Sequence, residues 1–132
     1  MPLSIDSALG VLPDALQLRA RRADLIASNL ANADTPNYKA RDIDFATALR
    51  RAGGGDIAMA RTSANHLDAG GSANSLETAM RYRMPSQPSL DGNTVDTDLE
   101  KGAFSENAVR YQATLHILSG RIRGLLTAIK GE

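Results

Sequence analysis

Apolar residues in the last third of the chain recur at steps that alternate between four and three residues, from Phe104 to Ile129. This spacing places them on one face of a helix, in the pattern of a coiled-coil seam. The C-terminal seam consists of Phe104, Ala108, Tyr111, Leu115, Leu118, Ile122, Leu125 and Ile129. The pattern predicts a helix that starts between Asn93 and Thr97, because Thr97 and Glu100 have the spacing of a capping box.

The first segment, from about Ser4 to Asn32, has a similar pattern. Its apolar positions are Ile5, Leu9, Leu12, Leu16, Ala23, Ile26 and Leu30, with Arg19 at the one polar place. Pro13 interrupts the pattern, because a proline inside a helix removes a hydrogen bond and clashes with the preceding turn. Either the helix bends at Pro13, or its regular part begins near Leu12 with Pro13 in its first turn.

These two seams predict a mainly α fold, in which long N- and C-terminal helices pair as an antiparallel coiled coil. The expected intramolecular seam is formed by Leu9, Leu16, Ile26, Leu30, Phe104, Tyr111, Leu115, Leu118, Ile122 and Leu125. The corresponding divisions of the chain are 1–38 for the first helix and its exit, 39–93 for a loop-rich outer segment, and 94–132 for the last helix.

The loop-rich segment contains signals for short elements. Asp44 is placed to cap a helix that runs to Arg51, and Gly53–Gly55 would end it. A short β element is expected around Ile57–Arg61. Within 80–84, methionine and tyrosine alternate with arginine, which predicts one exposed strand.

Apolar residues also lie off the two seams, and one partner helix cannot easily cover both faces. Two glycines at a four-residue spacing interrupt the last helix, although each costs about 1 kcal/mol relative to alanine. Either they let another helix approach closely, or they are tolerated near a helix end. The residues expected to contact neighbouring subunits are Leu18, Leu25, Ile117, Gly120, Gly124 and Leu126.

Composition argues against catalysis. Fifteen basic and fifteen acidic residues cancel, so no net field favours nucleic acid or an anionic membrane. The chain has no cysteine, which excludes disulfides and thiolate metal sites. Its two histidines, His66 and His116, are interpreted as surface residues, and no phosphate-binding loop or nucleophile elbow is present. We therefore expect no enzyme activity, cofactor, metal, nucleic-acid partner or membrane insertion.

The most specific motif is a helix exit. Its asparagines and aspartate compete for backbone hydrogen bonds and weaken the last helical turn. Pro36 and Asn37 suit the centre of a type II turn, whose second central residue needs a positive φ. Tyr38 would then fold back on the helix end. The motif residues are Ser28, Asn29, Leu30, Asn32, Thr35, Pro36, Asn37 and Tyr38.

This motif resembles the signature of bacterial flagellar rod and hook proteins, most of which have glycine at the place of Asn37. Segments 39–45, 85–96 and 107–113 look like the proximal-rod branch. The resemblance implies a structural rod subunit that assembles helically with itself and with other rod proteins.

It also implies a place in the basal body, in the periplasmic space, after flagellar type III export without a cleaved signal. The implied further partners are the inner-membrane ring adaptor and the export gate, and the implied roles are torque transmission and continuation of the export channel. The residues alone leave one alternative open, a helical coiled-coil adaptor or export chaperone.

Overall fold

The computed structural model describes residues 5–53, 80–85 and 89–131. The strand expected around Ile57–Arg61 lies outside these residues, and so does His66. The elements are α1 (Ile5–Leu9), α2 (Leu12–Ala31), β1 (Arg41–Ile43), α3 (Phe45–Ala52), β2 (Met80–Tyr82) and α5 (Thr97–Lys130). The predicted mainly α architecture is confirmed, because the long helices α2 and α5 pack against each other.

The first helical segment is divided into two helices. Helix α1 ends at Leu9, and Gly10 then takes a φ of 59°. A left-handed residue of this kind ends a helix easily when it is glycine. Helix α2 starts at Leu12 with Pro13 in its first turn. The second of the two alternatives for Pro13 is therefore the one that the structure adopts.

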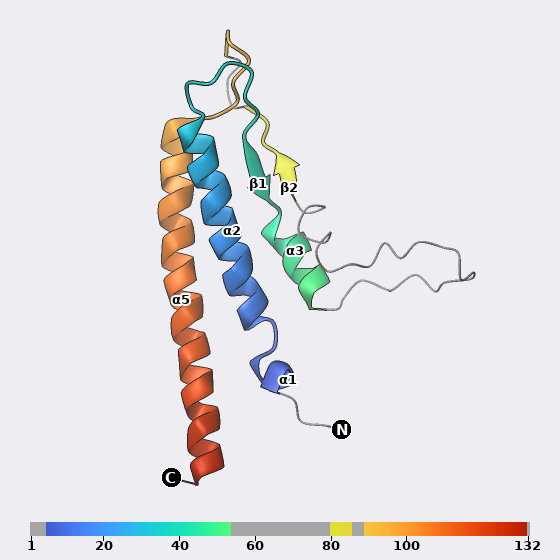
Figure 1. The fold of residues 1–132 in the computed structure, drawn as a ribbon, viewed down its shortest axis with the longest axis vertical. Coiled ribbons are helices and arrows are strands. Elements are labelled where there is room, and N and C mark those ends of the chain that lie inside the picture. Colours follow the sequence, from blue (N-terminus) through green and yellow to red (C-terminus); the bar gives the residue numbers. More distant parts are fainter. Residues whose placement is uncertain (1–4, 54–79, 86–88, 132) are drawn as a thin grey trace, which may run out of the picture.

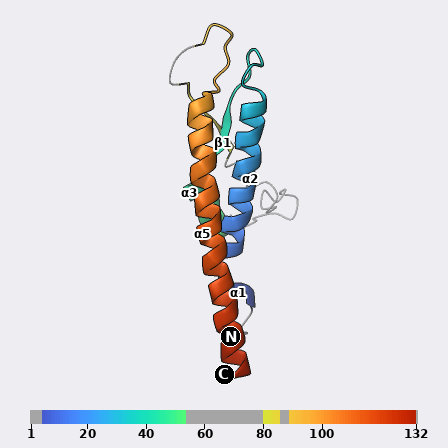
Figure 2. The same ribbon diagram turned by 90° about the vertical axis from the view of Figure 1, so that its left-hand side faces the viewer.

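Helices α2 and α5 run antiparallel along most of the length of α2, and α5 continues past α1 at the end that carries both termini (Figures 1 and 2). The N-cap of α5 is Asp96, whose Oδ1 accepts hydrogen bonds from the backbone N–H groups of Asp98 (3.1 Å) and Leu99 (3.2 Å). A capping box of Thr97 and Glu100 is therefore wrong, because the Glu100 side chain is buried elsewhere.

In the middle segment, β1 and α3 pack against α2, on the side away from α5 (Figure 1). Strands β1 and β2 pair antiparallel, with Arg41 opposite Tyr82. The strand at 80–82 was expected from the sequence, but its partner β1 was not. Asp44 caps α3 as predicted, since its Oδ1 accepts a hydrogen bond from the Thr47 N–H at 3.1 Å.

A small hydrophobic core joins α2 to this middle segment. Leu18 is only 3% exposed and clusters with Ile43 and Ala48. Partly buried residues pack around this cluster, and they are Leu25, Phe45, Leu49 and Met80. The assignment of Leu18 to a contact between subunits is wrong, because the chain's own middle segment covers this face of α2.

The burial of Leu18 predicts a large stability loss on truncation. Leu18→Ala removes apolar contacts and leaves a cavity, so its free energy of unfolding should fall by about 2–4 kcal/mol. Leu126→Ala is the matched control, because Leu126 is 50% exposed and its truncation should cost well under 1 kcal/mol. Urea unfolding followed by circular dichroism measures both. Equal losses in the two variants would contradict this description of the core.

Candidate functional site

The helix exit forms a tight turn at the end of the α2–α5 pair. The Tyr38 N–H donates to the Thr35 carbonyl at 3.3 Å, and Asn37 has a φ of 61°. This confirms the predicted positive φ. The Tyr38 hydroxyl lies 3.3 Å from Ser28 Oγ, so the ring folds back on α2 as expected.

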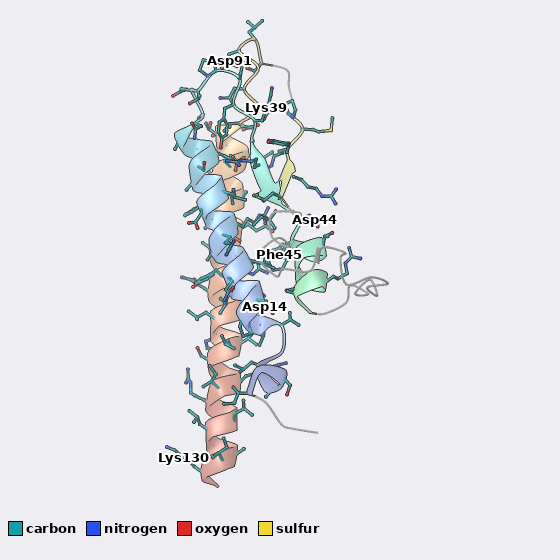
Figure 3. The ribbon with its side chains drawn as sticks, turned by 45° about the vertical axis from the view of Figure 1, so that its right-hand side comes forward. Asp14, Lys39, Asp44, Phe45, Asp91 and Lys130 are labelled. Carbon is teal, nitrogen blue, oxygen red and sulfur yellow. The ribbon has the colours of Figure 1, made fainter. Side chains whose placement is uncertain are left out.

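A second turn, before α5, closes on the first. The Asn37 N–H donates to the Asp91 carbonyl at 2.8 Å. Gly92 has a φ of 71°, and a Cβ there would lie 2.7 Å from Asn37 Oδ1. The positive φ favours glycine here, and any larger residue would also have to displace the Asn37 side chain. Asp91 and Lys39 mark this end of the molecule, far from Lys130 at the other end (Figure 3).

In this region, Ser28–Arg41 with Asp91–Val95, two asparagine side chains form hydrogen bonds with backbone groups. Asn93 Nδ2 lies 2.7–3.0 Å from three carbonyl oxygens at the end of α2, those of Asn32, Ala33 and Thr35. These carbonyls follow the last residue of α2, Ala31, and the Asn93 amide provides them with a donor, so it stabilises the exit. Asn29 pairs with Arg41 as a neighbouring strand would, because its Nδ2 donates to the carbonyl (2.8 Å) and its Oδ1 accepts from the N–H (3.1 Å).

A chain of charged groups connects the middle segment to both long helices. Arg22 on α2 binds both carboxylate oxygens of Asp42, at 2.8 and 2.9 Å. Arg83, just after β2, binds Asp42 Oδ2 at 2.6 Å and Glu100 Oε1 at 3.0 Å. Asn29 Nδ2 also donates to Glu100 Oε1, at 3.2 Å. The order Arg22–Asp42–Arg83–Glu100 thus joins α2, β1, the end of β2 and α5.

The two carboxyl groups of this network have opposite pKa shifts. Burial acts to raise the pKa of Asp42, but the hydrogen bonds from Arg22, Arg83 and the Ile43 N–H, with the charge of Arg22, together hold the pKa below its ordinary value. Burial raises the pKa of Glu100, and the nearby Arg83 only partly opposes this effect. Glu100 has no exposed surface, and its Oε2 has no hydrogen-bond partner.

Helix α5 buries a polar stripe, not its apolar seam, against the rest of the chain. The polar stripe is Glu100, Asn107 and Thr114, which are 0%, 2% and 9% exposed. Asn107 Nδ2 donates to the Arg19 carbonyl of α2 at 2.8 Å, which ties the stripe to α2.

The C-terminal seam lies at the edge of this contact. Its large exposed residues are between 37% and 82% exposed, and they are Phe104, Tyr111, Leu115, Ile122, Leu125 and Ile129. Leu118 is half-buried. On α2, Ile26 is fully buried, and Leu9, Leu16 and Leu30 are half-buried. The prediction that the C-terminal seam forms the centre of the intrachain contact is therefore wrong.

Beside the contact runs a groove of about 360 Å³, which we call the α2–α5 groove. Its lining consists of Arg19, Ala20, Ala23, Asp24, Phe104, Asn107, Ala108, Tyr111 and Gln112. Residues of the C-terminal seam therefore form one wall, and small residues of α2 form the other. Arg19 turns toward the middle segment, since its guanidinium lies 4.4 Å from the centre of the Phe45 ring.

Comparisons with known proteins identify the family. The family model described as "Flagella basal body rod protein" matches residues 11–39. The chain is 53% identical over 124 residues to the "Flagellar basal body rod protein FlgB" of Cereibacter sphaeroides (strain ATCC 17029 / ATH 2.4.9), with 94% of each chain covered. The FlgB protein of Escherichia coli (strain K12) is 46% identical over 133 residues, covering 96% of this chain and 95% of that one.

This chain belongs to the flagellar basal body rod protein family. The Salmonella typhimurium member is 43% identical over 133 residues, with 96% of each chain covered. The family is structural and not enzymatic, and it places the chain in the flagellar basal body.

Sequence reasoning identified the exit motif but not the groups that hold it. Arg83 was predicted to lie in an exposed strand, and Glu100 to form a capping box with Thr97, while Asp42 was noted within the family motif at 39–45. The structure instead brings Arg83, Asp42 and Glu100 together. Of the residues assigned to neighbours, Ile117 and Leu126 are 53% and 50% exposed, and a Cβ at Gly120 or Gly124 would meet nothing within 4 Å.

The positive φ of Asn37 predicts the outcome of two substitutions. Asn37→Val should lower the free energy of unfolding by about 1–3 kcal/mol, because a β-branched residue is strained at this conformation. Asn37→Gly is the control and should leave stability within about 1 kcal/mol of wild type, since glycine accepts φ 61° without strain. Thermal unfolding measures both. A valine variant as stable as the glycine variant would contradict the role of this turn.

Proposed function

We propose that the chain is a proximal-rod subunit that assembles helically with copies of itself and with other rod proteins, transmits motor torque and continues the export channel. In this proposal the terminal helices form the inner layer of the tube, and residues 39–93 face outward. The family membership supports a rod subunit, and the proximal-rod motifs at 39–45, 85–96 and 107–113 support the position.

The observation that carries this proposal is the uncovered apolar length of α5. Among the exposed large residues are Phe104, Leu115, Ile122, Leu125 and Ile129, which follow one another along the helix. Each buried Leu or Ile side chain contributes about 1.5–3 kcal/mol. A monomer forgoes most of this stabilisation, so a long exposed apolar face of this kind favours assembly.

The surroundings of such a subunit follow from the same family resemblance. We propose a periplasmic location, reached by flagellar type III export without a cleaved signal, and contacts with the inner-membrane ring adaptor and the export gate. Within the described residues, no helix is long and apolar enough to cross a membrane.

Contacts between subunits would use the α5 surfaces that nothing in the described chain covers. Ile117, Gly120, Gly124 and Leu126 belong to these surfaces. Leu25 packs partly against the core and would contribute only its exposed part. The two glycines lower helix stability, and no described residue lies within 4 Å of a Cβ at either position, which supports a close approach by a neighbouring helix.

The proposal predicts opposite effects on folding and on assembly. Gly120→Ala with Gly124→Ala should raise the helix stability of the isolated chain by about 1 kcal/mol per site. In a strain that lacks its own copy, this variant should be exported but should leave rods unassembled and cells non-swimming. Gly102→Ala is the matched control, because it also lies in α5 with nothing within 4 Å of a Cβ, and it should swim.

Soft-agar swimming and purified basal bodies give the readout. Normal swimming of the double variant would contradict a role for the two glycines in the contact between subunits. A wild-type copy that failed to appear in basal bodies would contradict the rod function itself.

A further inference from the structure

The α2–α5 groove has an apolar floor and one free negative charge at its rim. Ala20, Ala23 and Ala108 leave room beside Phe104 and Tyr111, which are 46% and 37% exposed. A helix with large apolar side chains would fill this space and bury both rings.

Asp24 provides the charge at the rim. It is exposed, and it makes no ion pair within the described part of the chain. Arg19, the other charged residue of the lining, is held over Phe45 and does not neutralise it. The occupant that fits is therefore an apolar helix with a cationic side chain on its flank.

The distal part of α5 has this chemistry. From Tyr111 to Lys130 the sequence contains Arg121, Arg123 and Lys130 and no acidic residue. Ile122, Leu125, Leu126 and Ile129 are 41%, 37%, 50% and 82% exposed. The segment therefore offers an apolar face flanked by positive charge.

The two arginines differ in their surroundings. Arg121 lies beside its own α1, since its Nη1 is 4.0 Å from the place of a Cβ on Gly10. Arg123 makes no ion pair among the described residues. Arg123 is therefore the cation free to meet an external carboxylate.

A chain cannot place this segment in its own groove. Helix α5 is continuous from Thr97 to Lys130, and its distal part extends past α1, away from the groove (Figure 1). If the distal segment fills such a groove, the groove belongs to another molecule, and every copy of the chain carries both the groove and the segment that fits it.

We propose that the distal α5 segment, Ile122–Ile129, of a second copy occupies the α2–α5 groove, with its Arg123 against Asp24. This inference rests on the proposed rod function and identifies one partner surface. The two surfaces differ, so the contact is heterologous, and a heterologous contact that does not close into a ring generates an open helical assembly.

Disulfide trapping tests the contact, because the chain has no cysteine of its own. Ala20→Cys on the groove is mixed with Leu126→Cys or with Ser119→Cys, each in the full chain, and the mixture is oxidised. We expect a crosslinked dimer of twice the 14.0 kDa chain mass from at least one pair. Which pair reacts gives the direction of the docked helix. Ala46→Cys, at an exposed position of α3, is the matched control and should not crosslink with either.

Charge reversal separates the proposed pair from nonspecific contact. In the crosslinking background, Asp24→Arg alone and Arg123→Asp alone should each lower the crosslinked yield several-fold. Combining Asp24→Arg on one copy with Arg123→Asp on the other should restore it. Arg121→Asp is the matched control and should leave the yield unchanged.

Three results would overturn the inference. The first is that Ala46→Cys crosslinks as strongly as Ala20→Cys. The second is that the combined charge reversal does not restore the crosslinked yield. The third is that, in basal bodies, Ala20→Cys crosslinks only to a different protein. In each case the rod function is judged separately, by whether the wild-type chain restores swimming to the deletion strain.

Discussion

The burial of Glu100 is the constraint on which the arrangement of the helices depends. An ionised carboxylate in a protein interior is strongly unfavourable unless charged and hydrogen-bonding groups surround it. Here Arg83 and Asn29 provide that surrounding, and Arg83 in turn is held by Asp42. Because Glu100 lies on α5 and these groups come from α2 and the strand region, Glu100 Oε1 gains its partners only when all of these elements are in place. The cluster thus specifies one relative position of the two long helices.

That position has a consequence for the surface of α5. With Glu100 and Asn107 directed toward the rest of the chain, the C-terminal seam lies beside the contact and remains half-exposed. Polar groups therefore hold the helices of the monomer together at one end, while the apolar seam along α5 stays largely exposed. This division fits the proposed rod subunit, which would fold locally and gain most of its stability on assembly, when neighbouring helices cover the seam.

The sequence predicted the local features well, because each depends on residues close together in the chain. The turn at Asn37, the cap at Asp44 and the break near Pro13 are of this kind. It did not predict the pairing of β1 or the network through Arg83, because these join segments distant along the chain.

The helical repeat also misassigned two faces. Periodicity shows which residues share a face of a helix, but not whether the chain itself or a neighbour covers that face. Leu18, which was assigned to a neighbour, is covered by the chain itself, and the C-terminal seam, which was assigned to the intrachain contact, is largely exposed in the described residues.

The most direct test compares two adjacent positions on α5, since Thr114 belongs to the polar stripe and Leu115 to the C-terminal seam. Thr114→Cys and Leu115→Cys introduce the only thiol into a chain without cysteine, and alkylation rates in the folded monomer report which face is covered. Thr114 is 9% exposed and Leu115 is 44% exposed. We expect the thiol at 115 to react much faster than the thiol at 114. Faster reaction at 114 would mean that the seam is buried within the chain, which would contradict this account.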